Sequence, residues 1–176
     1  MRLVKKHALT NLQILIVRGI NSMEDIMTVS DLMTGNPETV FPDDELGEVY
    51  VLMSERMIRH VPVIDSEGNI EGVISHRDLI RTALFEFDDL TYLDQRDALK
   101  GMLVRDVMTT DPDTIGPEMP LADAGRLLME NKIGCLPVVE GNRLVGILTE
   151  SDFIKHLVTE SELEQAELAA RPAIPH

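Results

Sequence analysis

"GVISHRD" at residues 72–78 and "GILTESD" at residues 146–152 are two copies of one pattern. Each copy holds a glycine, two aliphatic residues, a hydroxyl residue and, three positions later, an aspartate. Self-similarity at a fixed spacing is the sequence signature of a repeated structural unit. The pattern therefore indicates either a duplicated piece of fold or a duplicated binding site.

The flanking sequence extends the match in both directions. "VSDLMTGNPETVFPDDEL" from Val29 aligns with "VRDVMTTDPDTIGPEMPL" from Val104 at an offset of 75 residues, and "IRHVPVID" (58–65) aligns with "IGCLPVVE" (133–140) at the same offset. One residue is then lost in a turn, where loops tolerate changes of length. The chain therefore contains two repeats of about 55 residues, at 28–82 and 103–158.

The sequence of each repeat predicts strands and helices in the order β-α-β-β-α. In the first repeat, the Thr39-Val40 pair before Pro42 is expected to be extended, and Asp43 or Asp44 is expected to cap the next helix. Residues 61–64 and 70–75 are predicted strands around a Gly/Asn turn. Apolar residues at helical spacing predict two helices and their core faces: Leu46, Val49, Tyr50, Met53 and Met57 on one, and Leu79, Ile80, Ala83 and Leu84 on the other.

The predicted class is α/β (α+β), with the two repeats packed on each other because neither can bury its sheet alone. Residues 1–27 form an N-terminal extension, 83–102 a connector, and 159–176 a C-terminal helix and tail. The extension starts basic and turns apolar, but Asn11, Gln13 and Arg18 interrupt the apolar run. We therefore expect a packing helix there rather than a targeting signal or membrane span. Ser161 and Glu164 have capping-box spacing, and the composition favours a helix until Pro172, so we expect a terminal helix followed by a frayed end.

Charge and composition exclude several classes of function. The formal net charge is −15, and since residues 1–30 hold four basic and two acidic side chains, the rest of the chain carries −17. A surface this acidic repels phosphate backbones and anionic lipid. We therefore expect no nucleic-acid or membrane partner. The only cysteine is Cys135, which allows no intramolecular disulfide and suits the reducing cytoplasm. The sequence has no Walker-type loop, metal-binding His/Cys cluster or activated nucleophile, so we expect no enzyme and no catalytic cofactor.

The repeated hydroxyl and aspartate allow two interpretations. Ser75 to Asp78 and Thr149 to Asp152 each lie where a strand passes into a helix, so both pairs can be simple helix caps. The same geometry also suits a nucleoside phosphate. The helix amino terminus and the hydroxyl would hold phosphate, the aspartate would accept hydrogen bonds from both ribose hydroxyls, and the preceding glycine would let the ligand approach the strand.

Both repeats resemble the cystathionine-β-synthase (CBS) domain, and together they resemble the tandem pair, or Bateman module, that senses adenine nucleotides. The matching features are "DLMT/DVMT", the Thr-Val or Thr-Ile step before a proline, the Pro-Val strand and the final glycine-to-aspartate motif, over about 110 of the 176 residues. The resemblance implies a pseudo-twofold pair of repeats with two clefts between their sheets. Each cleft would join the final motif of one repeat to the "MT" and pre-proline segments of the other.

The resemblance implies two sets of nucleotide-binding residues in this chain. Cleft 1 would use Ser75, His76, Arg77, Asp78, Thr109, Thr114, Ile133, Gly134 and Cys135. Cleft 2 would use Thr149, Ser151, Asp152, Thr34, Thr39, Ile58, Arg59 and His60. Aspartate would take the ribose, Ser or Thr the phosphate, and the pre-proline backbone the adenine. His60 and Cys135 are expected to line the clefts rather than to bind metal or catalyse.

The implied function is a regulatory module for an adenine nucleotide. AMP or ADP is favoured over ATP because the acidic surface disfavours extra phosphates. Almost nothing else is attached in this sequence, so a free-standing tandem would act on an unknown protein partner in trans and form a homodimer through helices around Val49 and Leu127. The alternatives are an interaction scaffold with unoccupied clefts, and a binder of another adenosyl ligand or of a metal ion.

Overall fold

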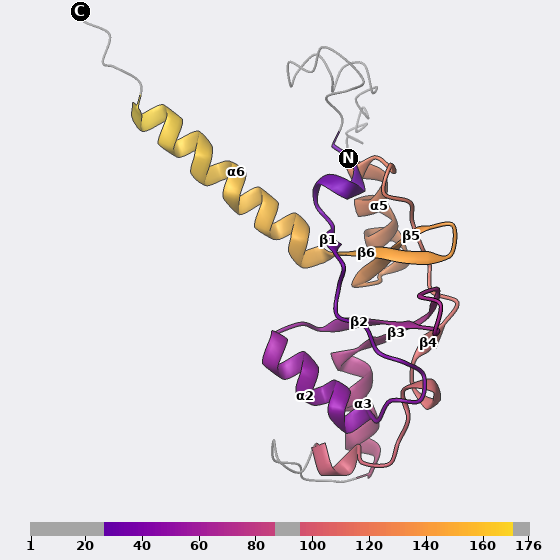
Figure 1. Cartoon of the computed structure of the whole chain (residues 1–176). Coiled ribbons are helices and arrows are strands. Elements are labelled where there is room, and N and C mark those ends of the chain that lie inside the picture. Colours follow the sequence, from indigo (N-terminus) through magenta and orange to yellow (C-terminus); the bar gives the residue numbers. More distant parts are fainter. Residues whose placement is uncertain (1–26, 87–95, 171–176) are drawn as a thin grey trace, which may run out of the picture.

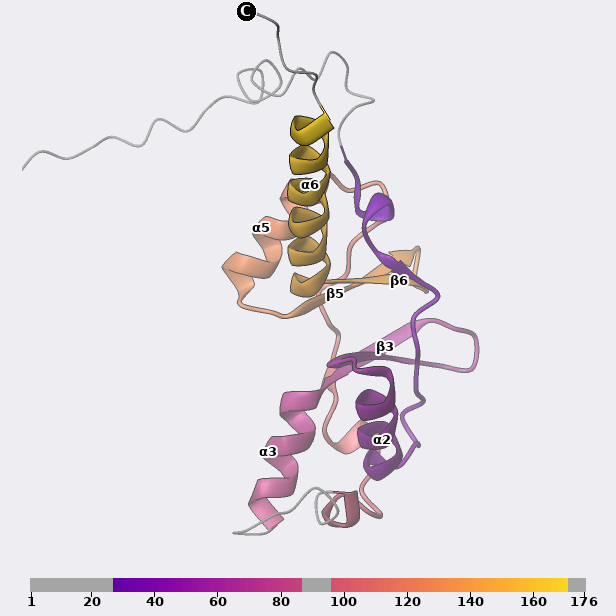
Figure 2. The same cartoon turned by 90° about the vertical axis from the view of Figure 1, so that its left-hand side faces the viewer.

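The protein is built as two stacked halves whose sheets face each other in the middle (Figures 1 and 2). The computed structural model describes residues 27–86 and 96–170, so the predicted N-terminal helix, the core of the connector and the end of the tail lie outside the described residues. Each half is a three-stranded antiparallel sheet, and its helices lie on the outer side of the sheet. Two packed repeats in an α/β arrangement are therefore confirmed.

The lower half in Figure 1 contains most of the first repeat. Its sheet has the order β2 (His60–Ile64), β3 (Ile70–Ser75) and β4 (Thr109–Thr110). Helices α2 (Leu46–Arg56) and α3 (His76–Glu86) cover it. A short 3₁₀ turn, η3 (Val104–Asp106), precedes β4.

The upper half contains most of the second repeat. Its sheet has the order β1 (Thr34–Gly35), β6 (Arg143–Thr149) and β5 (Cys135–Glu140). Helices α5 (Leu121–Asn131) and α6 (Glu150–Ala170) lie above it, and the 3₁₀ turn η2 (Val29–Asp31) precedes β1. Among the described helices, none is both long and apolar enough to cross a membrane.

The repeats exchange their first strands. β1 of the first repeat pairs with β6 of the second, with Thr34 opposite Ile147, and β4 of the second repeat pairs with β3 of the first, with Thr109 opposite Val73. Core residues are exchanged too: Val29 is fully buried in the upper core and Val104 in the lower core. Neither half is complete without the other repeat.

The motif glycines serve this exchange. A Cβ at Gly72 would stand 2.8 Å from the Thr109 carbonyl oxygen and 2.9 Å from the Met108 sulfur. A Cβ at Gly146 would stand 2.5 Å from the Met33 sulfur. These glycines therefore admit the incoming strand and methionine of the other repeat, which corrects our expectation that they make room for a ligand.

Other contacts join the halves across the middle. Val73, Cys135 and Ile147 form a small buried cluster between the two sheets. The two hairpin turns also bond to each other, because the Ile70 amide donates to the Asn142 carbonyl and the Leu144 amide to the Gly68 carbonyl, both at 3.0 Å. The interface is thus apolar in its centre and hydrogen-bonded at its rim.

Three local expectations are wrong. Asp44 does not cap α2; its carboxylate accepts from the Phe41 amide at 2.8 Å, and the Leu46 amide donates instead to the Met102 carbonyl at 2.9 Å. Met57 is not in the core: it ends α2 in the left-handed region (φ 53°) with its side chain 90% exposed. The predicted C-terminal helix is present up to Ala170, but it does not start at Ser161, because α6 runs unbroken from Glu150.

Candidate functional site

The turn from β3 into α3 is closed by a reciprocal pair of hydrogen bonds. The Asp78 carboxylate accepts at Oδ2 from the Ser75 amide (3.0 Å) and hydroxyl (2.5 Å), and the Asp78 amide donates to Ser75 Oγ at 3.3 Å. This is a capping box, in which residues three apart satisfy the free groups at a helix start. The capping interpretation therefore holds for this pair.

The turn from β6 into α6 repeats the arrangement. Asp152 accepts at Oδ2 from the Thr149 amide (2.8 Å) and hydroxyl (2.7 Å). The two aspartates differ at the second oxygen: Asp152 Oδ1 lies 3.7 Å from Lys155 Nζ, whereas Asp78 Oδ1 makes no hydrogen bond within the described ranges. Asp152 is also the more buried, with 7% of its surface exposed. Capping thus leaves one oxygen of Asp78 available to a ligand.

The strand exchange brings a threonine of one repeat beside the capped turn of the other. Thr34 lies on β1, next to the strand that ends at Thr149, and Thr109 lies on β4, next to the strand that ends at Ser75. Both threonines are exposed. This is the cross-repeat arrangement that the resemblance implies.

The exchanged strands β1 and β4 each begin a longer segment. Thr39 and Thr114 lie at the far ends of these two segments. The Val40 amide donates to the Pro62 carbonyl and the Ile115 amide to the Pro137 carbonyl, both at 3.1 Å. Each threonine therefore stands beside the sheet of its own repeat. The segments 34–39 and 109–114 cross from one sheet to the other.

The pre-proline segments bond to the helix starts of their own repeats. The His76 amide donates to the Arg59 carbonyl at 2.8 Å, and the Glu150 amide donates to the Gly134 carbonyl at 3.3 Å. The first amide of each helix is therefore already paired. This leaves fewer free amides for a phosphate than the sequence suggested.

His60 reaches from the first repeat to the second. A Cβ at Gly134 would stand 2.7 Å from His60 Nε2, so the imidazole needs a glycine at that position. His60 was expected in cleft 2 and Gly134 in cleft 1, but the structure puts them in contact. His60 therefore touches a residue predicted for the other cleft, and its own place in cleft 2 stays a prediction.

The charges of both turns act on His60. Its burial lowers the pKa of the imidazole, which is the largest effect, while Asp78 and Glu150 raise the pKa and Arg77 and Arg59 lower it further. The net direction is below the ordinary value. His60 is thus a neutral, partly buried ring whose pKa depends on charged residues at the starts of both α3 and α6.

Cys135 is buried in the cluster between the sheets. Its burial, with a smaller contribution from Asp78, raises the pKa of the thiol to about 12. Because the thiolate is the reactive form of cysteine, this side chain is chemically inert. Cys135 is therefore a packing residue of the interface between the two sheets.

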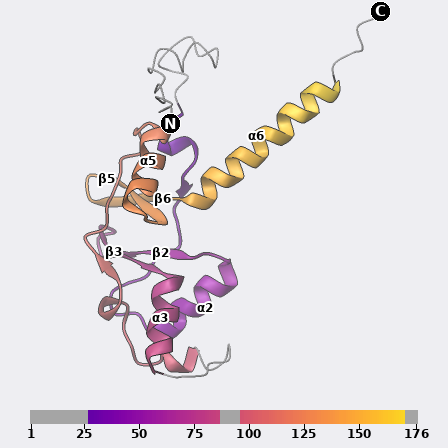
Figure 3. The ribbon, with the colours of Figure 1, turned by 180° about the vertical axis from the view of Figure 1, so that it is seen from behind.

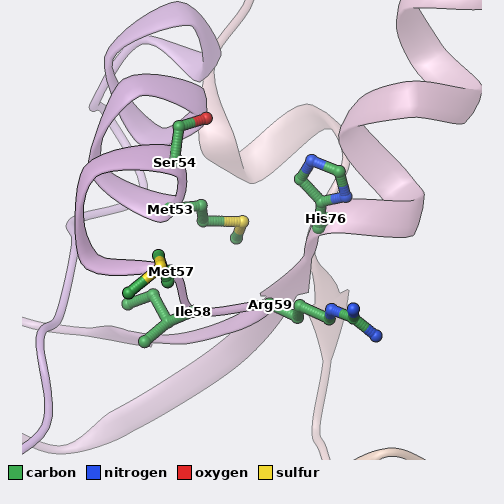
Figure 4. Close-up of a pocket in the computed structure, with 6 residues that line it drawn as sticks. All are labelled: Met53, Ser54, Met57, Ile58, Arg59 and His76. Carbon is green, nitrogen blue, oxygen red and sulfur yellow. The ribbon is translucent and has the colours of Figure 1, made fainter.

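A pocket of about 250 Å³ opens beside the first turn, between the carboxyl end of α2 and the start of α3 (Figure 4). Its lining combines residues assigned to different clefts, since Ile58 and Arg59 meet His76 there. His76 faces α2, and its ring stacks on Tyr50 with centroids 6.0 Å apart and planes 19° apart. The His76 ring is therefore turned toward α2, and only Arg77 is left to supply a positive charge from this turn.

The sequence did not single out Tyr50 or Lys155 as site residues. Tyr50 was assigned to the core by its helical spacing, and it is indeed buried while also stacking on His76. Lys155 is recognisable only as the cation three residues after Asp152 on one helix face. Among the described residues, no group of three or more His, Cys, Asp or Glu is placed to hold a metal ion.

Comparison with known proteins assigns both repeats to one family. The family model described as CBS domain matches residues 29–84 and again residues 104–159. The uncharacterized protein MJ1426 of Methanocaldococcus jannaschii is 32% identical over 168 residues, covering 81% of this chain and 98% of its own length.

Solved structures of other proteins share this two-repeat fold. A putative acetoin utilization protein (AcuB) from Vibrio cholerae superposes with a TM-score of 0.64 at 31% identity, covering 84% of this chain and 99% of its own. CBSX2 of Arabidopsis thaliana, crystallised in complex with AMP, superposes with a TM-score of 0.63 at 31% identity, covering 76% and 98%. Two repeats in this arrangement are thus shared with proteins of similar length.

Proposed function

The chain belongs to the CBS-domain family, with two repeats in tandem, and from that premise we propose that it senses an adenine nucleotide in the clefts between its repeats and regulates a protein partner. The coarser conclusion, a ligand-sensing regulatory module, follows from the family and its neighbours. The nucleotide, its preferred cleft and the action on a partner are our proposal. We further propose AMP or ADP before ATP, action in trans, and a cytoplasmic location.

One observation carries the proposal. The strand exchange sets the turn of Asp78 beside Thr109 of the other repeat, and the cap leaves Asp78 Oδ1 without a hydrogen bond in the described part of the chain. A carboxylate oxygen at such a place can accept from a ribose hydroxyl, and charge-assisted bonds of this kind are strong. CBSX2, which is 31% identical, binds AMP, which supports the same class of ligand for this chain.

The two clefts are unequal in this proposal, and the Asp78 cleft binds more tightly. Arg77 contributes a positive charge to the Asp78 turn, whereas Glu150 occupies the start of the other helix and repels an anion. Asp152 is also more buried and already faces Lys155. One charge-assisted contact contributes about 1.5–3 kcal/mol, which corresponds to about ten- to a hundredfold in affinity.

Calorimetric titration with AMP tests this proposal. Asp78→Asn keeps an acceptor oxygen for the cap but removes the charge, so it is expected to abolish the tighter binding phase. Asp152→Asn is the matched control in the other turn and is expected to leave that phase largely intact. If Asp152→Asn is the more damaging, the order of the clefts is reversed. If AMP binds with neither phase affected, the motif is not the ribose site.

The second candidate is an interaction scaffold with unoccupied clefts. It is favoured by the completeness of both caps, since Asp78 and Asp152 each accept two hydrogen bonds without any ligand. A thermal-shift panel of AMP, ADP, ATP, other adenosyl compounds and divalent cations separates the candidates, because a ligand that binds only the folded state raises its melting temperature. A scaffold predicts no shift with any of them.

A further inference from the structure

His60 makes a close contact across the boundary between the two repeats. Its half-buried imidazole lies so near to Gly134 that a Cβ there would stand 2.7 Å from Nε2 and 2.8 Å from Cε1. A Cβ does not come this close to another atom without displacing it, so the ring fits only over a glycine backbone. The adenine role expected of the two pre-proline segments does not require this contact.

The two sides of this contact are each bonded to the start of a helix. The carbonyl of Arg59, the neighbour of His60, accepts from the amide of His76, the first residue of α3, at 2.8 Å. The Gly134 carbonyl accepts from the amide of Glu150, the first residue of α6, at 3.3 Å. α3 leaves the lower sheet and α6 leaves the upper one (Figures 1 and 3). The contact thus lies between the two helix starts.

These helix starts are also the two capped turns. Asp78 closes the turn 75–78 by accepting from the Ser75 amide and hydroxyl, and Asp152 closes the turn 149–152 by accepting from the same two groups of Thr149. A series of bonds and contacts therefore runs from one turn to the other, and it crosses between the repeats where the His60 ring meets Gly134.

Electrostatics gives independent evidence that His60 is near both turns. Burial has the largest effect and lowers the pKa of the imidazole, but the charges of Asp78 and Glu150 both raise it. Asp78 belongs to the start of α3 and Glu150 to the start of α6. The ring is therefore within electrostatic range of both helix starts, through space as well as along the bonded series.

The repeats are not symmetric at this contact. At the offset of 75 residues, His60 aligns with Cys135 and Gly134 aligns with Arg59. The short side chain of Cys135 is buried with Val73 and Ile147. An imidazole over a glycine is thus present on one side of the pseudo-twofold axis and, by residue type, not possible on the other.

We propose that His60 is a positioning residue that couples the two capped turns, so that a change at one turn alters the other. A displaced start of α3 moves the Arg59 carbonyl, and the imidazole then shifts the Gly134 backbone and the start of α6. Coupling between two sites is reciprocal, so a ligand at either turn changes the affinity of the other. This regulation rests on the proposed function, whereas the link between the turns is present without a nucleotide.

Backbone amide NMR and hydrogen exchange of the full-length protein test the link. Asp78→Asn weakens the cap of α3 and is expected to speed exchange of the Glu150 amide in the other repeat by about two- to thirtyfold, the range of energies that such coupling carries. Asp152→Asn is expected to act in the same way on the His76 amide. In a His60→Ala background each variant is expected to affect only its own turn.

Two further variants separate the link from general packing. Gly134→Ala keeps His60 but forces its ring away, so it is expected to abolish the response across the repeats as His60→Ala does. Ile147→Val is the matched control, because it trims the neighbouring apolar cluster and leaves the contact in place. A response across the repeats that survives both His60→Ala and Gly134→Ala, or that is absent from wild type, overturns the proposal.

Titration with AMP distinguishes this proposal from the proposed function. AMP that fills only the tighter phase is expected to shift the amide signals of both His76 and Glu150 in wild type, and of one of them in His60→Ala. If AMP binds wild type and shifts only one of the two signals, the coupling is wrong and the proposed function stands. If AMP does not bind, the proposed function fails, and the responses to Asp78→Asn and Asp152→Asn still decide the link.

Discussion

At the scale of the residue, glycine and histidine control how closely the two repeats approach. Gly72 and Gly146 each lie under the exchanged strand of the other repeat, and Gly134 lies under the His60 ring. At all three positions the missing side chain makes room for another part of the chain. The motif glycine that suggests a ligand in the sequence is thus first a packing residue.

Gly72→Ala is expected to lower the free energy of unfolding by about 1–3 kcal/mol, the usual cost of overpacking. The added methyl would meet the Thr109 carbonyl, which is backbone and cannot swing aside. Gly35→Ala on β1 is the control, since its Cβ would meet nothing within 4 Å. Urea unfolding measures both, and equal stabilities would show that the close approach is not needed.

The stability of the protein is expected to fall through His60 as the pH drops below about 6.5. Burial holds the pKa of His60 below its ordinary value of 6.5, so the unfolded state binds the proton more readily. This contribution to stability is complete above about pH 6.5 and is lost as the pH falls from there to the folded-state pKa. Urea unfolding of His60→Gln should show a weaker pH dependence than wild type. Parallel pH profiles for His60→Gln and wild type would contradict this role.

At the scale of the element, the exchanged strands make each sheet depend on both repeats. β1 and β4 are only two residues long, yet each brings a fully buried valine to the other half, from the turns η2 and η3. Leu99, also fully buried, joins the lower core from beyond the first repeat. The repeat in the sequence is therefore not the unit that folds.

Separate fragments 27–95 and 96–170 are expected to be largely unfolded alone and to regain structure when mixed. The first lacks β4, Leu99 and Val104, and the second lacks β1 and Val29, so each exposes part of a core. Circular dichroism of each fragment and of the equimolar mixture measures this. Cooperative thermal unfolding of either fragment by itself would show that a half is stable alone.

At the scale of the whole molecule, the exposed apolar surface matches only part of what the sequence suggested, because Met129 lies in the stretch around Leu127 but Val49 is not exposed. Val49, which we expected at a dimer interface, is 1% exposed and belongs to the lower core. Among the described residues, the large exposed apolar side chains are Met57 and Met129 at the carboxyl ends of α2 and α5, Phe41, and four residues on α6: Ile154, Leu157, Val158 and Leu163. A homodimer therefore stays a prediction, now resting on these methionines.

We expect light scattering at micromolar concentration to give the mass of a dimer, and Met57→Glu with Met129→Glu to shift it toward the monomer. Burying a charge at an apolar interface is costly, while both side chains are free of the cores. Phe41→Ser is the control, an exposed apolar residue outside the helices. A monomeric wild type would refute the prediction.

Features that depend on neighbours along the chain could be predicted before the fold was known. The strands were predicted at 61–64 and 70–75 and are found at 60–64 and 70–75, and a helix starts after Ser75 and after Thr149 as predicted, because short apolar runs and the capping box involve residues a few positions apart. The cross-repeat placement of Thr34 and Thr109 came from the resemblance to a family and not from spacing.

Features set by contacts between residues far apart in the sequence became visible only in the folded chain. Three such contacts join segments 26 or more residues apart. They are the packing of the motif glycines against the other repeat, the contact of His60 with Gly134, and the stacking of His76 on Tyr50. The Leu46 amide pairs with Met102 rather than with Asp44 for the same reason. Packing and hydrogen bonding act through space, so a local pattern leaves these partners open until the chain has folded.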